Sequence, residues 1–341
     1  MRNTDGSARL PVLKRAVRSL LGANLPYFLG SYAHDLAKNP RFPDWPCDFR
    51  DVPAYGAMLE ARSIGLEAVR VWLCEGAEGI EVDEKGRITG VRAELLDRVK
   101  QLEEGALVAG VRIYFGLLDA NSALRDDDGV TYSIFADADQ TRRFAELVAA
   151  PIARILDERV SIALEVVNEP ETLTPDCPDE PKSSSASPLS WQSMGSAINT
   201  IRSAIAAAKP DLLVTAGTTH AFLPKLWKSG ANLHAVNIHV YHANGGLPSR
   251  KDLAAYVGDE HMLQLPLFAG ECGIPKVPGP EEPFSLANFL YNADKNDYQA
   301  AFLWKLEGDL IDTGPKQRPP TELALAVKKT MAKRPTDGFR T

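Results

Sequence analysis

Long apolar runs are missing from this sequence. No uninterrupted run approaches the roughly 20 residues that cross a lipid bilayer, so we expect no membrane-spanning segment and no membrane partner. The N-terminal stretch 1–22 also lacks the continuous apolar centre of a secretory signal, because Lys14, Arg15 and Arg18 interrupt it. We therefore expect a cytoplasmic protein, or a secreted one if a leader has been removed.

An excess of positive charge is missing too. The formal net charge is −7, with 38 Lys and Arg against 45 Asp and Glu, and the two signs are interspersed without a basic block. Because a nucleic-acid-binding surface needs a basic patch or stripe, no nucleic-acid partner is expected. A polyanionic substrate is disfavoured for the same reason, unless one local patch outweighs the net charge.

Cysteines are few, and their spacing matches no zinc pattern. The four are Cys47, Cys74, Cys177 and Cys272. Cys74 and Cys272 lie at the ends of predicted strands, where we expect free, buried thiols. Cys47 and Cys177 lie in predicted loops, and the sequence does not decide whether a disulfide joins them.

Motifs for cofactors and metals are also missing. Neither GxGxxG nor GxxxxGKS/T occurs, which disfavours an enzyme that uses a nucleotide cofactor. His239 and His242 form an HxxH pair, but no HxH or HExxH accompanies them. We therefore expect neither a metal nor another cofactor.

Short apolar runs are present along the whole chain and predict β-strands. They lie at Leu25–Gly30, Ala68–Leu73, Val111–Leu117, Ser161–Val167, Leu212–Ala216, Ala235–His239, Leu265–Ala269 and Ala300–Trp304. Runs such as VRVWL and VRIYF are almost continuously apolar. Such runs are typical of strands that are buried on both faces of a parallel sheet.

Amphipathic stretches between these runs predict helices. They lie at Val52–Ile64, Arg92–Ala109, Ala138–Leu156, Trp191–Ala208, Ala221–Ser229 and Phe284–Lys295. The alternation predicts an α/β fold, a single-domain (β/α)8 TIM barrel over residues 1–341. We expect an extra N-terminal helix within residues 1–21, at Leu10–Leu21, to cap the barrel, and residues 171–190, rich in Pro, Ser and Asp, to form a loop over the active-site face.

Two of the predicted strands end in a glutamate. The run ALEVVNEPE ends a strand with Asn168 and Glu169, and LPLFAGECGI ends another with Glu271. Strand ends at the carboxyl face of a barrel are where catalytic groups lie. Two carboxylates held there predict paired-carboxylate catalysis, and glycoside hydrolysis is the main chemistry that needs such a pair.

From GANLPYF at 22–28 to FLWKLEGD at 302–309, the sequence resembles clan A glycoside hydrolases, the cellulase-like family 5 and its relatives. The resemblance implies that Glu169 is the acid/base and Glu271 the nucleophile. It implies a retaining glycoside hydrolase that cleaves a β-linked glycoside or oligosaccharide by double displacement. We expect burial and the charge of Glu271 to raise the pKa of Glu169.

The resemblance also implies residues that bind the carbohydrate substrate. Arg70, a charge within an apolar strand, is expected to keep Glu271 ionised. In similar enzymes the counterpart of Asn168 binds the 2-hydroxyl of the reacting sugar, and Trp304 matches an aromatic residue that floors the sugar site. His239 and Tyr241 lie on one face of a strand and match a His-x-Tyr whose tyrosine hydroxyl contacts the nucleophile.

One stretch departs from the family pattern. Many members carry a histidine on or after the third strand, whereas this chain has FGLLDAN, with Asp119 and Asn121 as candidate sugar ligands. An acidic residue there could instead recognise an amino or otherwise unusual sugar. Glu75, after the second strand, is expected to be a solvated loop residue. A transglycosylase on the same site and a non-catalytic carbohydrate-binding barrel remain alternatives.

Overall fold

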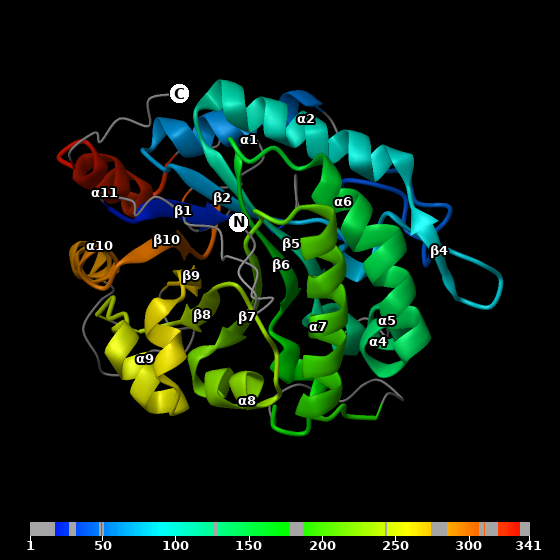
Figure 1. Cartoon of the computed structure of the whole chain (residues 1–341). Coiled ribbons are helices and arrows are strands. Elements are labelled where there is room, and N and C mark those ends of the chain that lie inside the picture. The colour runs from blue at the N-terminus through cyan, green and yellow to red at the C-terminus, as the bar shows by residue number, and fades with distance from the viewer. Residues whose placement is uncertain are drawn as a thin grey trace, which may run out of the picture.

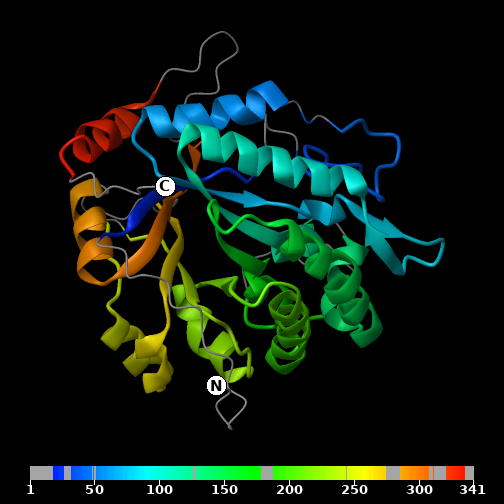
Figure 2. The same cartoon turned by 45° about the horizontal axis from the view of Figure 1, so that its top comes forward.

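The computed structural model describes residues 18–26, 32–47, 49, 51–125, 128–177, 187–242, 244–273, 285–306, 310 and 320–334. Parallel strands form a closed barrel in the order β1-β10-β9-β8-β7-β6-β5-β2, and β1 pairs with β2 to close it. Helices surround this barrel on the outside (Figures 1 and 2). The predicted (β/α)8 TIM barrel is confirmed.

The barrel strands follow the predicted apolar runs, with one exception. They are β1 (Leu20–Asn24), β2 (Ala68–Trp72), β5 (Arg112–Asp119), β6 (Ser161–Asn168), β7 (Val214–Thr219), β8 (Val236–Val240), β9 (Leu267–Cys272) and β10 (Tyr298–Leu303). Inside the lower barrel, aromatic rings of Tyr114, Phe268 and Phe302 meet edge to face. Gly22 leaves room for this packing, because a Cβ there would lie 2.5 Å from the Phe302 ring.

The first strand was predicted in the wrong place. The structure puts β1 at Leu20–Asn24 instead of Leu25–Gly30, so the last two residues of the predicted N-terminal helix belong to the barrel. The apolar pair Leu20 and Leu21 fits either a helix or a buried strand, and pairing with β10 and β2 decides for the strand. Arg18 and Ser19 are not helical, and residues 1–17, with the remainder of that predicted helix, lie outside the described residues.

The described helices cover the six predicted amphipathic stretches, but the helices at Ala120–Arg125, Gly129–Ala136, Arg250–Val257 and Glu322–Met331 were not predicted. The described helices are α1 (Asp51–Ser63), α2 (Ala93–Ala109), α3 (Ala120–Arg125), α4 (Gly129–Ala136), α5 (Ala138–Phe144), α6 (Ala150–Ile155), α7 (Trp191–Ala208), α8 (Leu223–Lys228), α9 (Arg250–Val257), α10 (Leu286–Lys295) and α11 (Glu322–Met331). A π-helical turn, η2 (Ala145–Ala149), joins α5 to α6. Ser190 caps α7 by accepting from the amide of Ser193, which explains its sharp start.

Short elements at the strand ends were not predicted. The antiparallel hairpin of β3 (Ile80–Val82) and β4 (Ile88–Val91) projects beside α5 in Figure 1. One-turn helices follow β2, β6, β7 and α9, namely η1 (Glu75–Ala77), η3 (Pro170–Leu173), η4 (His220–Phe222) and η5 (Glu260–Gln264). Of the predicted loop at 171–190, residues 178–186 lie outside the described part.

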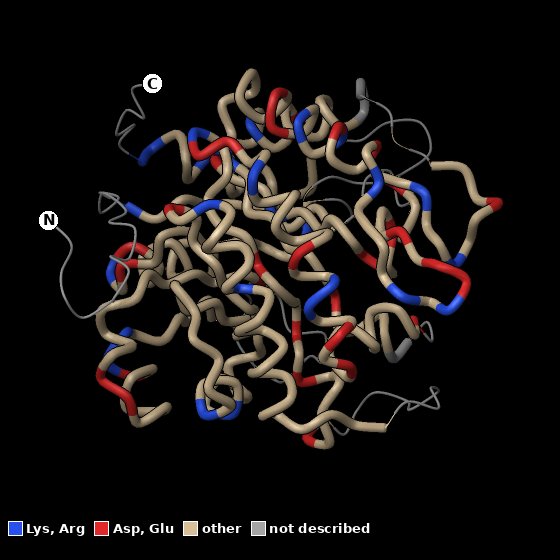
Figure 3. Tube along the Cα trace, turned by 45° about the vertical axis from the view of Figure 1, so that its right-hand side comes forward, with Lys and Arg blue, Asp and Glu red and all other residues tan. Residues whose placement is uncertain are grey.

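Acidic and basic residues are interspersed along the described trace (Figure 3). This distribution agrees with the interspersed charge of the sequence. Among the described helices, none is long and apolar enough to cross a membrane.

Candidate active site

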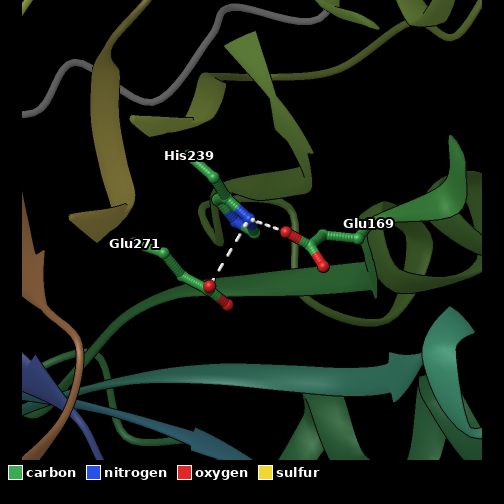
Figure 4. Close-up of side chains that lie close together, drawn as sticks. All are labelled: Glu169, His239 and Glu271. Carbon is green, nitrogen blue, oxygen red and sulfur yellow. Dashed lines mark hydrogen bonds and ion pairs between the residues drawn. The ribbon is translucent and has the colours of Figure 1, made fainter. Parts of the chain in front are cut away.

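The barrel brings Glu169 and Glu271 to one mouth. Glu169 follows β6 and Glu271 lies near the end of β9, and parallel strands place both at the carboxyl face. One carboxylate oxygen of each and one ring nitrogen of His239 lie within 4.8 Å of one another. Figure 4 shows the imidazole between the two carboxylates. Carboxyl groups about 5–5.5 Å apart are typical of retaining glycosidases, and the observed spacing leaves little room for an intervening water.

Both oxygens of Glu271 are held by donors. Arg70 Nη1 donates to Oε1 at 2.9 Å, and the Tyr241 hydroxyl donates to Oε2 at 2.7 Å. Burial raises the pKa of Glu271, while positive charge on His239 and Arg70 and the bond from Tyr241 act against that rise. The predicted contacts of Arg70 and Tyr241 with Glu271 are therefore present in the structure.

Arg70 is fully buried and joins several strands. Its Nε and Nη2 donate to the two oxygens of Glu165 at 3.0 and 2.9 Å, a bidentate ion pair. Nη1 also donates to Asn24 Oδ1 at 2.9 Å, and Nη2 donates to Asn168 Oδ1 at 2.7 Å. Sequence reasoning missed Glu165, although a charge within the apolar run ALEVV is the same signal that singled out Arg70.

Glu169 lies in a left-handed backbone conformation, with φ 48° and ψ 57°. For a residue with a Cβ this conformation costs about 1–2 kcal/mol, so its surroundings must maintain it. The amide of Glu169 donates to Gly217 O at 2.8 Å, and the amide of Thr172 donates to Glu169 O at 3.1 Å. The side chain is held as well, because Asn121 Nδ2 donates to Oε2 at 3.0 Å and His239 Nδ1 lies 3.0 Å from Oε1.

A further buried carboxylate supports this turn. Glu171 accepts from the Thr218 hydroxyl at 2.8 Å, from the amide of Thr219 at 2.7 Å and from the Thr219 hydroxyl. These bonds attach the turn that contains Glu169 to the end of β7. Burial raises the pKa of Glu171, and the charge of Glu169 adds to the rise. The sequence reasoning did not single out Glu171.

The expected rise in the pKa of Glu169 is wrong. Burial acts upward, but the bonds from His239 and Asn121 outweigh it and lower the pKa to about 2. Burial lowers the pKa of His239, yet the charges of Glu271 and Glu169 raise it above its usual value. The raised pKa favours the imidazolium, whose Nδ1 lies 3.0 Å from Glu169 Oε1 and 3.8 Å from Glu271 Oε2. The proton of the pair therefore rests on His239.

Asp119 and Asn121 lie beside Glu169. Asp119 Oδ1 accepts from Asn168 Nδ2 at 3.0 Å and from Asn121 Nδ2 at 3.1 Å. Burial and the charge of Glu169 raise the pKa of Asp119 to about 6, against the hydrogen bonds from the two amides. Asn121 thus contacts Glu169 directly, and Asn168 links Asp119 to Arg70. Binding of sugar by these residues stays a prediction.

Trp304 directly follows β10 and is partly exposed. Its ring meets Trp72 edge to face, with centroids 6.0 Å apart and an interplanar angle of 88°. The guanidinium carbon of Arg70 lies 4.3 Å from the centroid of Trp72. Trp304 therefore packs against the buried Trp72 beside the ion pair, and its role as a floor for the sugar stays a prediction.

Among the described residues, Glu169, His239 and Glu271 are the group whose ligand atoms lie close enough for a metal ion. Arg70 and Tyr241 already donate to both oxygens of Glu271, however. A cation there would have to compete with the guanidinium. The expectation of a metal-free site stays a prediction.

The structure also tests two predictions that do not concern Glu169 and Glu271. Cys47 forms no disulfide, so the possible bond to Cys177 is absent, and the buried Cys74 and Cys272 carry free thiols. Glu75 was expected to be solvated, but its side chain is buried in the one-turn helix that follows β2. The tripeptide Glu75–Ala77 contains no large apolar side chain, so its sequence does not indicate that this turn packs against the barrel.

Comparisons with solved structures find the same fold in proteins that are named as glycoside hydrolases. An endo-1,4-β-mannanase from Eisenia fetida is similar in structure, with 18% identity, a TM-score of 0.67, and coverage of 93% of this chain and 91% of that one. A β-1,4-D-mannanase from Cryptopygus antarcticus has 19% identity, a TM-score of 0.66 and the same coverages of 93% and 91%. A GH5-4 broad-specificity endoglucanase from an uncultured bacterium has 15% identity, a TM-score of 0.60 and coverages of 92% and 94%. No family model and no curated protein matches the chain.

Proposed function

We propose that the protein is a retaining glycoside hydrolase for β-linked glycosides, with Glu271 as nucleophile and Glu169 as acid/base. The observation that carries the proposal is the approach of the two carboxylates to within 4.8 Å across one mouth. At this range a sugar's anomeric carbon can contact Glu271 while its leaving oxygen contacts Glu169. An inverting enzyme would need a wider gap, about 6.5–9.5 Å, to admit a water molecule.

In the first step Glu271 attacks the anomeric carbon and the glycosidic bond breaks. Arg70 and Tyr241 hold the two carboxylate oxygens, which fixes the attacking oxygen before the substrate binds. As the ester bond forms, Glu271 loses its negative charge. Arg70 is not left unpaired, because Glu165 still accepts two hydrogen bonds from it.

The leaving oxygen takes its proton from the pair of Glu169 and His239. Because Nδ1 of His239 lies 3.0 Å from Glu169 Oε1, the proton can move from the imidazolium to the carboxylate and on to the leaving group, which leaves a neutral imidazole. Glu169 is then ionised beside the glycosyl-enzyme. It can take a proton from the water that attacks the intermediate, and this returns the pair to its starting state.

The structural neighbours suggest which substrates to test first. The proteins reported above are named as mannanases and as an endoglucanase, so aryl β-mannosides, aryl β-glucosides, mannans and β-glucans form the first panel. Turnover with retention of the anomeric configuration, followed by NMR, is the expected result. Inversion, or no turnover of any glycoside, would contradict the proposal.

Substitution of the nucleophile tests the mechanism. Glu271→Ala should abolish turnover, and added azide should restore it with inverted configuration, because azide can occupy the space of the lost carboxylate. Glu169→Ala should spare substrates with activated leaving groups, which need no proton. Equal loss with activated and unactivated leaving groups would show that Glu169 is not the acid/base.

A further inference from the structure

Asp119 carries a negative charge that the described structure does not balance. Arg70 pairs with Glu165 and Glu271, and His239 lies against Glu169 and Glu271. Within the described chain no lysine, arginine or histidine forms an ion pair with Asp119, whose hydrogen-bond donors are neutral amides.

The hydrogen bonds of Asp119 all go to one of its oxygens. Asn168 and Asn121 donate to Oδ1, whereas Oδ2 makes no hydrogen bond within the described part of the chain. Oδ2 is not among the buried polar atoms that lack a hydrogen-bond partner, and Asp119 is partly exposed. The open oxygen can therefore be reached by a ligand. A partly desolvated carboxylate with an open oxygen favours a donor that brings positive charge, because its other neighbours supply none.

The position of Asp119 defines which part of a substrate it can reach. Asp119 pairs in register with Asn168 on β6, and Asn121 joins it to Glu169. A sugar whose C1 lies between Glu169 and Glu271 has C2 and the ring oxygen as the nearest ring atoms. Of these only C2 carries a polar substituent, so the C2 substituent is the sugar group that we assign to this side of the mouth.

We propose that Asp119 recognises a protonated amine at C2, so that the preferred substrates are β-linked 2-amino-2-deoxy sugars with a free amine. This inference rests on the proposed function and makes it more specific. An N-acetylated sugar would lose the positive charge, and a neutral hexoside would offer only a hydroxyl. Charge-assisted hydrogen bonds are roughly twice as strong as neutral ones, so the preference should be large enough to measure.

The test compares three 4-nitrophenyl β-glycosides that share one leaving group, those of glucosamine, N-acetylglucosamine and glucose. The wild type should hydrolyse the glucosaminide with kcat/KM at least about tenfold above the glucoside. Asp119→Asn keeps an acceptor for the two amides but removes the charge, so it should bring that ratio close to one. Asp97→Asn, an exposed aspartate of α2, is the matched control for net charge and should leave the ratio unchanged.

The outcomes separate this inference from the proposed function. If the glucoside is cleaved at least as well as the glucosaminide, or if Asp119→Asn leaves the ratio unchanged, the inference is wrong while the hydrolase proposal stands. If none of the three glycosides nor any of the neutral panel is cleaved, the proposed function itself fails.

A measurement on the unmodified protein covers the case in which Asp119→Asn does not fold. Glucosamine should raise the Tm of the wild type more than glucose, N-acetylglucosamine or ammonium chloride at equal concentration, because only glucosamine combines the ring with the charge. Equal shifts would overturn the inference.

Discussion

Nδ1 of His239 lies 3.0 Å from Oε1 of Glu169, and this contact decides where the proton of the site rests. A glutamate buried near another carboxylate would by itself have a raised pKa. The imidazole changes that balance, since its own pKa is raised while the pKa of Glu169 is lowered to about 2. The two side chains therefore titrate as a pair.

The basic limb of the pH profile should depend on His239. In the wild type, kcat/KM should fall only above the ordinary histidine pKa of 6.5, because the pair then loses its proton. In His239→Asn the proton must be held by Glu169 alone, so the basic limb should move to lower pH. His242→Asn, an exposed neighbour in the HxxH pair, is the control. An unmoved limb in His239→Asn would refute the pairing.

The acidic limb should depend on Tyr241. Its hydroxyl donates to Glu271 Oε2 and lowers the pKa of that carboxyl. Tyr241→Phe should therefore raise the pKa of Glu271, and the acidic limb of kcat/KM should move to higher pH with a loss of kcat of about 10- to 100-fold. Tyr256→Phe, on the exposed face of α9, should have no effect. A lower pH for the acidic limb would contradict the assignment.

Glu165 should stabilise the barrel strongly. Arg70 is fully buried, and removal of one buried partner from a charged pair costs about 3–5 kcal/mol when the other charge is left uncompensated. Since Arg70 keeps Glu271, we expect Glu165→Gln to lower the free energy of unfolding by about 2–4 kcal/mol, measured by urea denaturation. Asp83→Asn, which breaks the exposed pair with Arg87, should change it far less. Similar losses in both variants would argue against this account.

Asp119 should destabilise the folded protein at neutral pH. Its pKa in the folded state is raised to about 6 from 3.8, so the folded state binds the proton more tightly than the unfolded one. Stability from this group is then present below pH 3.8 and lost as the pH rises through about 6. Asp119→Asn should raise Tm at pH 7.5, with a smaller effect near pH 4. If Asp119→Asn raised Tm only at acid pH, the predicted rise in the pKa of Asp119 would be contradicted.

The fold could be predicted from the sequence because short apolar runs alternate regularly with amphipathic stretches along the chain. The helix at Trp191–Ala208 was predicted to the residue, since a serine cap precedes an amphipathic run. The exception is β1, whose five residues LLGAN are too short to show a period and owe their conformation to β10 and β2. The hairpin β3–β4 was missed because its strands cover only three and four residues.

The sequence by itself determined the barrel and the presence of two glutamates at strand ends, because strand order and strand ends follow from local patterns. Only the tertiary structure decided the electrostatics of the site. It placed Arg70 between Glu165 and Glu271, His239 against Glu169, and Asp119 beside two amides without a cation. These partners come from different strands, and a pKa depends on distances between side chains that no local pattern encodes.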